Sequence, residues 1–275
     1  MKKTISLILS SILIVGLAGC AAKKDTAANT SGTAAAAEKK VIKIGATPIP
    51  HKEILEFVKP LLEKKGYTLD IKEFTDYVQP NIALNDGELD ANFFQHIPYL
   101  QKMNEEKKLN LDYTVKVHIE PMGVYSRKIK SLKDLKAGAT IAVPNDPTNE
   151  ARALRVLENA GLFKLKSGDL VTSVDITDNP NKYKIKELEA AQLPRTLDDV
   201  DAAVINTNYA LDAKLNPTKD ALAIEDKSSP YANVLAVRKE DKDKPAIKAL
   251  SEVLNSPEVK KFIEDTYKGS IIPAF

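Results

Sequence analysis

From residue 41 onward the apolar residues switch between two spacings, and this alternation limits the fold more than any other feature. Residues 41–45 (VIKIG) alternate apolar and polar side chains, which is typical of a half-buried strand. Residues 51–65 place apolar side chains three or four positions apart and stop at Gly66, which is typical of a helix. The pattern then repeats, with strands expected at 68–74 and 89–94 and helices opening at Pro80 and near Ile97. Strands that alternate with helices predict an α/β fold with a largely parallel sheet.

A second unit of the same kind follows an extended stretch at residues 112–126. Its strands are expected at 140–143, 201–205 and 233–237 and its main helix at 150–160, and a helical pattern at 245–267 is expected to return to the first unit. Two such units predict two lobes with a ligand cleft at the carboxyl ends of the strands. We expect lobe 1 to comprise residues 41–126 plus 236–275 and lobe 2 residues 127–235, with hinges near 125–127 and 234–237.

The first twenty residues have the layout of a bacterial secretory signal. Two lysines precede an apolar run at residues 5–17, which is too short to span a bilayer comfortably as a mature helix. The sequence LAGC at 17–20 resembles a lipobox, in which the cysteine is acylated before cleavage; the alternative is an N-terminal anchor that stays attached. Cys20 is the only cysteine, so an exported chain has no internal disulfide. We expect cleavage of residues 1–19, palmitate or a similar acyl chain on Cys20, and a flexible tether at 20–40.

This anchor predicts a protein at the cell membrane, facing the outside or the periplasm, and other classes of function find little support. With 40 basic and 38 acidic side chains the net charge is +2, whereas a nucleic-acid-binding protein needs a concentrated basic face. An enzyme is not expected, because the chain has no glycine-rich phosphate loop and no serine in a G-x-S-x-G context. His51, His96 and His118 are spread along the sequence with no close pair, so neither a metal site nor a cofactor is expected.

The segment PNDPTNEAR, which ends at Arg152, gives the sharpest local signal for a binding site. A strand runs into a turn there, and Thr148 or Asn149 can cap the helix that follows. Arg152 then falls in the first turn, where the helix dipole disfavours a cation unless an anion lies beside it. A guanidinium matches a carboxylate through two hydrogen bonds, so one hypothesis is a ligand carboxylate at this position. The alternative is a surface arginine paired with Glu150, Glu158 or water.

Aromatic residues form a second group, at Tyr77, Phe93, Phe94 and Tyr99, with His96 among them. Neighbouring residues of a strand point to opposite faces, so only one phenylalanine of the pair can face a cleft. An aromatic wall would suit an apolar side chain and especially a thioether. The alternative is ordinary core, which is the commoner use of such residues.

Asparagines form a third group, with Asn206 and Asn208 after one predicted strand and Asn233 at the start of the next. Amides both donate and accept hydrogen bonds, so they can hold the ammonium and the carboxylate of a small zwitterion. The alternative is that they are turn residues.

The order and spacing of six segments resemble the MetQ/NlpA-type methionine-binding lipoproteins over essentially all of residues 41–275. The matching segments are YVQPN at 77–81, FQHIPYL at 94–100, VPNDPTNEAR at 143–152, LEAAQLPRTL at 188–197, VINTNYA at 204–210 and SPY at 229–231. The resemblance implies a two-lobed periplasmic-binding-protein fold of the type II-like class. It also implies a protein that delivers methionine to an ABC permease and its ATPase.

In that family the ligand lies between side chains that this sequence matches one by one. The resemblance places Arg152 at the ligand carboxylate, Tyr77, Phe94, His96 and Tyr99 around the ligand side chain, and Asn149, Asn206 and Asn233 at the polar end. Phe93 departs from the family pattern and is left out of the predicted site. The resemblance leaves the ligand open between L-methionine, D-methionine, related derivatives and methionine-containing dipeptides. An alternative of the same class is a binding protein for another small apolar amino acid. An interpretation from a different class is a surface adhesion lipoprotein with an unused cleft.

Replacing Cys20 by alanine should release the protein from membranes and leave its ligand affinity unchanged, because the predicted tether separates the anchor from the folded part. The measurement is the partition of wild-type and Cys20→Ala protein between membrane and soluble fractions. Retention of the variant in membranes after a high-salt wash would contradict the lipobox prediction.

Overall fold

The computed structural model of the protein describes residues 40–226 and 230–275. The predicted signal peptide, the predicted lipid site at Cys20 and nearly all of the predicted tether lie outside the described residues. Among the residues that are described, we find no helix with the length and apolar composition that a membrane crossing requires.

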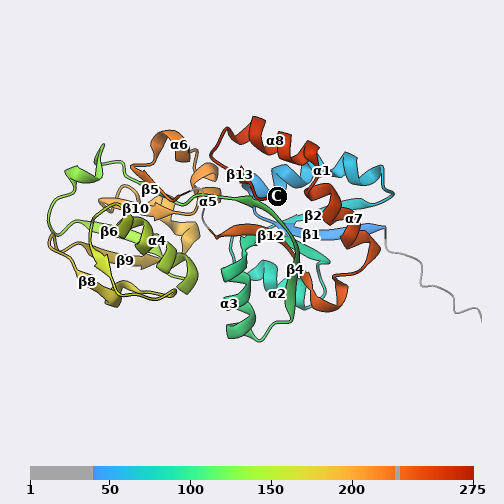
Figure 1. The fold of residues 1–275 in the computed structure, drawn as a ribbon, viewed down its shortest axis with the longest axis horizontal. Helices are drawn as coiled ribbons and strands as arrows, with labels where there is room; N and C mark the ends of the chain where they lie inside the picture. The colour runs from blue at the N-terminus through green and yellow to red at the C-terminus, as the bar shows by residue number, and fades with distance from the viewer. Residues whose placement is uncertain (1–39, 227–229) are drawn as a thin grey trace, which may run out of the picture. The chain divides into compact units, whose positions relative to one another are not determined.

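The first sheet has the strand order β13-β4-β12-β3-β1-β2 (Figure 1). Its strands are β1 (Val41–Ala46), β2 (Thr68–Glu73), β3 (Ala91–His96), β4 (Leu111–Ile119), β12 (Ala232–Arg238) and β13 (Ile272–Pro273). Strand β1 pairs in parallel with β2 and β3, whereas β12 runs antiparallel to β3 and β4. Three of the five pairings in this sheet are antiparallel, so the prediction of a largely parallel sheet is wrong here. Strand β12 returns from the second sheet and runs against both of its neighbours.

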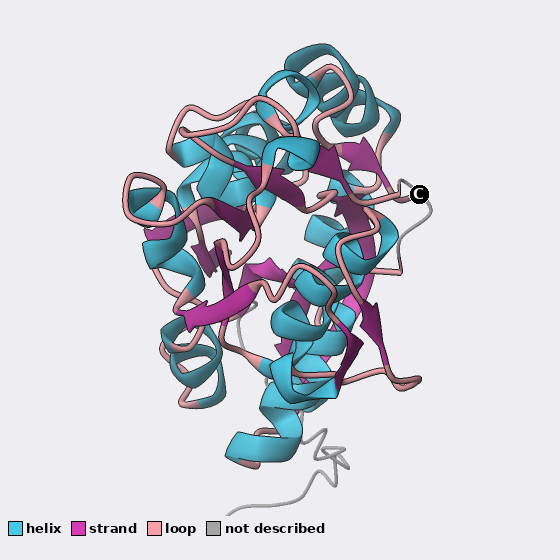
Figure 2. Cartoon of the chain, turned by 90° about the vertical axis from the view of Figure 1, so that its left-hand side faces the viewer, coloured by secondary structure: helices cyan, strands magenta, loops and turns pink. Residues whose placement is uncertain are grey.

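The second sheet has the strand order β11-β5-β10-β6-β9. Its strands are β5 (Gly123–Tyr125), β6 (Thr140–Pro144), β9 (Lys184–Leu188), β10 (Ala202–Ile205) and β11 (Ala223–Ile224), and β7 (Lys164–Leu165) with β8 (Ile176–Asp178) forms a small separate pair. Strand β6 is parallel to both of its neighbours, and β5 is antiparallel to both of its own. In Figure 2 the left-hand side of Figure 1, which carries the second sheet, faces the viewer, and helices lie around the strands.

Apolar helix faces close a hydrophobic core over each sheet. The helices are α1 (Glu53–Glu63), α2 (Gln79–Asn85), α3 (Ile97–Lys107), α4 (Pro147–Asn159), α5 (Thr207–Asp212), α6 (Pro217–Asp220), α7 (Pro245–Leu254) and α8 (Pro257–Tyr267). As expected, the terminal helices α7 and α8 pack with α1 on the first sheet, where Phe57 stacks on Phe262 at 4.3 Å between ring centroids. In the second core, α4 buries Ala151, Leu154 and Leu157 completely or nearly so.

The chain passes between the two sheets at two places. Strand β4 belongs to the first sheet and β5 to the second, so the first crossing lies at residues 120–122; the second lies between β11 and β12. The predicted hinges at 125–127 and 234–237 stay a prediction; Tyr125 and residues 234–237 lie in strands that are paired inside the sheets, next to these crossings. The lobe boundaries stay a prediction, and the strand pairing favours moving both of them a few residues toward the N-terminus.

Helix α4 begins three residues earlier than expected. Its N-cap is Asp146, whose carboxylate accepts a hydrogen bond from the backbone N–H of Asn149 at 3.0 Å. Pro147 occupies the first helical position, which proline favours, and the cap therefore falls on the residue before it. The prediction of a cap at Thr148 or Asn149 is wrong, and Arg152 lies in the second turn of the helix rather than the first.

Replacing Asp146 by alanine should lower the free energy of unfolding by about 0.5–2 kcal/mol, because the N–H groups at the start of α4 lose their acceptor. Asparagine caps helices as well as aspartate does, so Asp146→Asn should retain most of the stability. Denaturant unfolding of the three proteins measures the difference. An equal loss in both variants would show that the charge of Asp146, and not its role as a cap, stabilises the helix.

Candidate ligand-binding site

A small pocket collects side chains from both sheets and from the segments that follow their strands. Its lining residues are Tyr77, Phe94, Gln95, His96, Tyr99, Glu120, Asn149, Arg152, Asn206, Thr207, Asn208 and Asn233. All eight residues that we predicted to bind ligand are among them. The structure therefore brings the predicted residues together, and their roles in binding stay predictions.

Three aromatic rings pack together on one side of the pocket. The centroid of the Tyr77 ring lies 5.8 Å from that of Phe94 and 5.8 Å from that of Tyr99. The Tyr99 hydroxyl donates to the backbone oxygen of Tyr77 at 3.0 Å, and the Tyr77 hydroxyl donates to Asn208 at 2.6 Å. Phe93 points to the other face of β3 and is completely buried in the first core. The expectation that only one phenylalanine of the pair faces the pocket is confirmed.

His96 links this aromatic group to the amides. Its Nδ1 accepts the backbone N–H of Tyr99 at 3.1 Å, so Nε2 carries the proton and donates to Oδ1 of Asn149 at 3.0 Å. Burial, followed by the nearby charge of Arg152, lowers the pKa of His96 to about 3. The imidazole is therefore neutral at physiological pH. Asn206 donates to the same Asn149 oxygen at 2.8 Å, while its own buried Oδ1 has no hydrogen-bond partner among the described residues.

Arg152 is buried and held by a carboxylate from a distant part of the chain. Its Nε donates to both oxygens of Glu225, at 2.9 and 3.1 Å, and its Nη2 donates to Glu225 and to the backbone oxygen of Glu120 at 2.6 Å. The guanidinium also lies 4.4 Å from the centroid of the Tyr231 ring. A surface arginine paired with Glu150 or with Glu158 is therefore the wrong alternative. Within the described residues its Nη1 makes no hydrogen bond.

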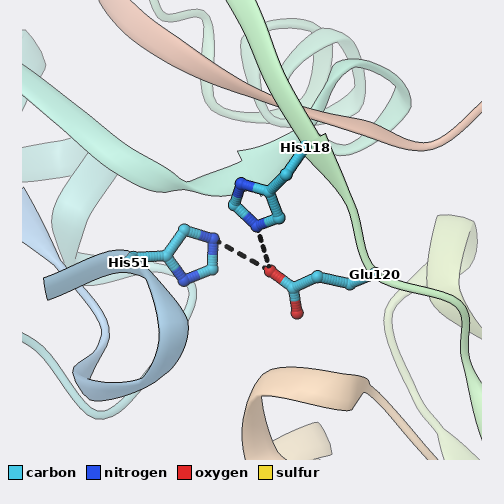
Figure 3. Close-up of side chains that lie close together, drawn as sticks. All are labelled: His51, His118 and Glu120. Atoms are coloured by element: carbon cyan, nitrogen blue, oxygen red, sulfur yellow. Dashed lines mark hydrogen bonds and ion pairs between the residues drawn. The ribbon is translucent and has the colours of Figure 1, made fainter. Parts of the chain in front are cut away.

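Two histidines that were expected to lie apart are neighbours in space. The rings of His51 and His118 lie 5.0 Å apart, and Figure 3 shows both directed at one oxygen of Glu120, at 3.1 and 2.7 Å. The expectation of no close histidine pair is wrong, because β4 places His118 beside the turn after β1 that carries His51. Each of the three residues offers one atom that could coordinate a metal, and these atoms lie within 4.8 Å of one another. The cluster therefore has the donor set of a metal site.

Four lining residues were not predicted to bind: Gln95, Glu120, Thr207 and Asn208. Gln95 alternates with Phe94 and His96 in β3 and bonds Asn81 and Asn92 in a buried amide network. Asn208 appears among the candidate amides but not in the predicted site. Glu120 lies inside the extended stretch at 112–126, which was expected to lead from the first unit to the second, and this was the only available signal.

Comparison with known proteins gives a consistent result. The family model described as NlpA lipoprotein matches residues 42–275. The methionine-binding lipoprotein MetQ of Bacillus subtilis (strain 168) is 47% identical over 257 residues, which cover 90% of this chain and 93% of that protein. A nutrient-binding protein from Burkholderia cenocepacia, solved bound to methionine, is 52% identical with a TM-score of 0.83, covering 85% of this chain and all of its own. A periplasmic substrate-binding protein of an ABC transporter from Coxiella burnetii is 47% identical with a TM-score of 0.82, with coverage of 85% and 100%.

The neutral state of His96 predicts a measurable pH dependence of stability. The unfolded chain binds a proton at this histidine below pH 6.5, whereas the folded protein does so only near pH 3. The free energy of unfolding should therefore fall with decreasing pH between these values, and His96 should account for about 2–3 kcal/mol of the loss at pH 4.5. In His96→Gln protein this part of the loss should be missing. The measurement is denaturant unfolding at several pH values. An equal fall of the free energy of unfolding with decreasing pH in wild type and variant would contradict the lowered pKa of His96.

Proposed function

The chain belongs to the NlpA lipoprotein family, and from this membership we propose that it is the substrate-binding lipoprotein of an ABC importer, which captures methionine in the L or D form. Relatives named for methionine binding and for ABC transport support this proposal. The observation that carries it is the composition of the pocket, where three aromatic rings lie with a buried guanidinium and buried amides.

The polar side of the pocket suits the backbone groups of an amino acid. The Nη1 of Arg152 is the donor that we assign to the ligand carboxylate, because the rest of the guanidinium is held by Glu225. A fixed guanidinium loses little further freedom when it binds, so its bond to a carboxylate is strong and directional. The amides of Asn149, Asn206 and Asn233 complete this side.

The aromatic side suits an unbranched thioether. Sulfur makes favourable contacts with the edges of aromatic rings, and Tyr77, Phe94 and Tyr99 present such rings. A glutamine side chain of similar length would bury an amide there, and an unpaired amide costs about 1–3 kcal/mol. We therefore expect methionine to bind more tightly than glutamine.

The proposal includes the place and the partners of the protein. After export, a lipid on Cys20 would hold the protein at the membrane, facing the outside or the periplasm. The ligand-loaded form would dock on the membrane permease, whose ATPase drives transport. We assign the protein no catalytic role, because nothing in the lining of the pocket requires one.

A thermal-shift screen of the twenty amino acids tests the proposed ligand class. A ligand that binds only the folded state raises the melting temperature, so methionine should give the largest shift. A protein that ignores every amino acid would support the adhesion interpretation instead.

Replacing Arg152 by alanine should weaken methionine binding by about 2–5 kcal/mol, since the ligand carboxylate would be buried without its partner. This corresponds to roughly 30-fold to several-thousand-fold weaker binding. Lysine should restore only part of the affinity, because it offers a point charge where a planar fork is needed. Calorimetric titration of methionine measures the loss.

Arg155→Ala is the matched control, because Arg155 lies one turn along the same helix but bonds Glu158 and two loop carbonyls outside the pocket. Its affinity for methionine should stay within about twofold of wild type. Arg152→Ala protein that is folded and binds methionine as tightly as the control would show that the carboxylate is held elsewhere.

A further inference from the structure

Glu120 lines the pocket, and one of its carboxylate oxygens has no hydrogen bond within the described residues. The residue is 5% exposed, and its Oε1 is shared by Nε2 of His118 at 2.7 Å and Nε2 of His51 at 3.1 Å. The described part of the chain provides no hydrogen bond to Oε2, and Figure 3 shows this oxygen pointing away from both rings. A buried carboxylate oxygen is costly to leave unbonded, so its position in the lining of the pocket indicates a ligand group that donates.

The surrounding groups keep Glu120 charged. The hydroxyl of Thr47 can donate to Nδ1 of His51, which lies 2.8 Å away. In that tautomer Nε2 carries the proton, 3.1 Å from Oε1 of Glu120 and 3.1 Å from Oδ1 of Asn233. Burial opposes ionisation, but the two histidines outweigh it and hold the pKa of Glu120 below its ordinary value. The carboxylate is therefore an anion fixed in place by two N–H donors.

A second acceptor belongs to the same pocket. Asn206 is 6% exposed, and its Oδ1 is buried without a hydrogen-bond partner among the described residues. The next residue, Thr207, donates its hydroxyl to the backbone oxygen of Pro121 at 2.5 Å, and Pro121 follows Glu120 directly. This bond ties the start of α5 to the first crossing between the sheets, and it keeps the two acceptors in neighbouring segments.

The pocket thus holds both acceptors and donors that have no hydrogen bond within the described residues. Glu120 and Asn206 offer oxygens, whereas Arg152 offers Nη1 and has most of its charge balanced by Glu225. A carboxylate and a guanidinium in one small pocket are complementary to a zwitterion, and the three N–H groups of an ammonium can serve both acceptors at once.

We propose that Glu120, supported by His51 and His118, binds the α-ammonium group of the ligand together with Asn206, and thereby restricts the site to compounds with a free amino group. This inference rests on the proposed function and adds the residue that selects the ligand class. The histidines are positioning residues, because they contact Glu120 and do not line the pocket. A metal ion at the cluster would need the Nε2 lone pairs, which in this arrangement are occupied by the protons directed at Oε1.

The test compares methionine with its 2-hydroxy analogue, in which a hydroxyl replaces the ammonium. Both compounds are titrated by calorimetry into wild-type and Glu120→Gln protein. Glutamine keeps the size of the side chain but removes its charge, so methionine should bind at least about tenfold more weakly to the variant. The affinity of the 2-hydroxy analogue, which keeps the carboxylate but lacks the positive charge, should change by less than about threefold.

Glu150→Gln is the matched control, since Glu150 is a buried glutamate on the helix of Arg152 that bonds the backbone of Ser173 and does not line the pocket. Both ligands should bind this variant within about twofold of wild type. Asn206→Ala provides a second variant, which should also weaken the binding of methionine more than the binding of the 2-hydroxy analogue.

Equal weakening of both ligands by Glu120→Gln and by Asn206→Ala would overturn the inference and leave these residues a purely structural role. An unchanged affinity for methionine would also overturn it, because the ammonium would then be held elsewhere. Saturable binding of Zn²⁺ that disappears in Glu120→Gln protein and blocks methionine would assign the cluster to a metal. Failure of wild-type protein to bind methionine at all would instead contradict the proposed function itself.

Discussion

The site depends on one buried ion pair, between the guanidinium of Arg152 and the carboxylate of Glu225. A buried charge without a partner is strongly destabilising, so each of these residues fixes the other. Arg152 projects from α4, whereas Glu225 follows β11 and exchanges backbone and side-chain bonds with Met122. Arg152 also bonds the backbone oxygen of Glu120. A single interaction thus ties a helix of the second core to both segments where the chain crosses between the sheets.

This constraint explains how the pocket can be specific while most of its polar atoms are already paired. His96, Asn149 and Asn206 satisfy one another in a chain of hydrogen bonds, and the imidazole stays neutral within it. Among the described residues, the lining groups without a hydrogen bond include Nη1 of Arg152 and the acceptor oxygens of Glu120 and Asn206. A pocket whose walls are fixed by their own bonds loses little entropy when a ligand enters, and the groups without a hydrogen bond decide which ligand can.

The sequence predicted the local elements better than the contacts between them. Apolar spacing located β1, α1 and β2 closely, because each buries one face and its period is visible in the chain. The cap of α4 was missed because Thr148, Asn149 and Asp146 can all cap a helix, and only the preference of Pro147 for the first turn separates them. The sequence could not predict that Glu225 contacts Arg152 or that His118 contacts His51, because these pairs depend on how β4, β5 and β11 pair in the sheets. The antiparallel direction of β12 was missed for the same reason, because it depends on contacts between distant strands. The predicted lining came mainly from a family resemblance and not from the residue pattern alone.

We infer that this pocket holds a free amino acid with a thioether side chain. The test is mass spectrometry of the small molecules that are released when protein purified from its native cells is denatured. We expect methionine, at close to one molecule per folded chain, and a large reduction of this signal in Arg152→Ala protein purified in the same way. Recovery of a different compound without an amino group, in equal amounts from wild type and variant, would contradict it.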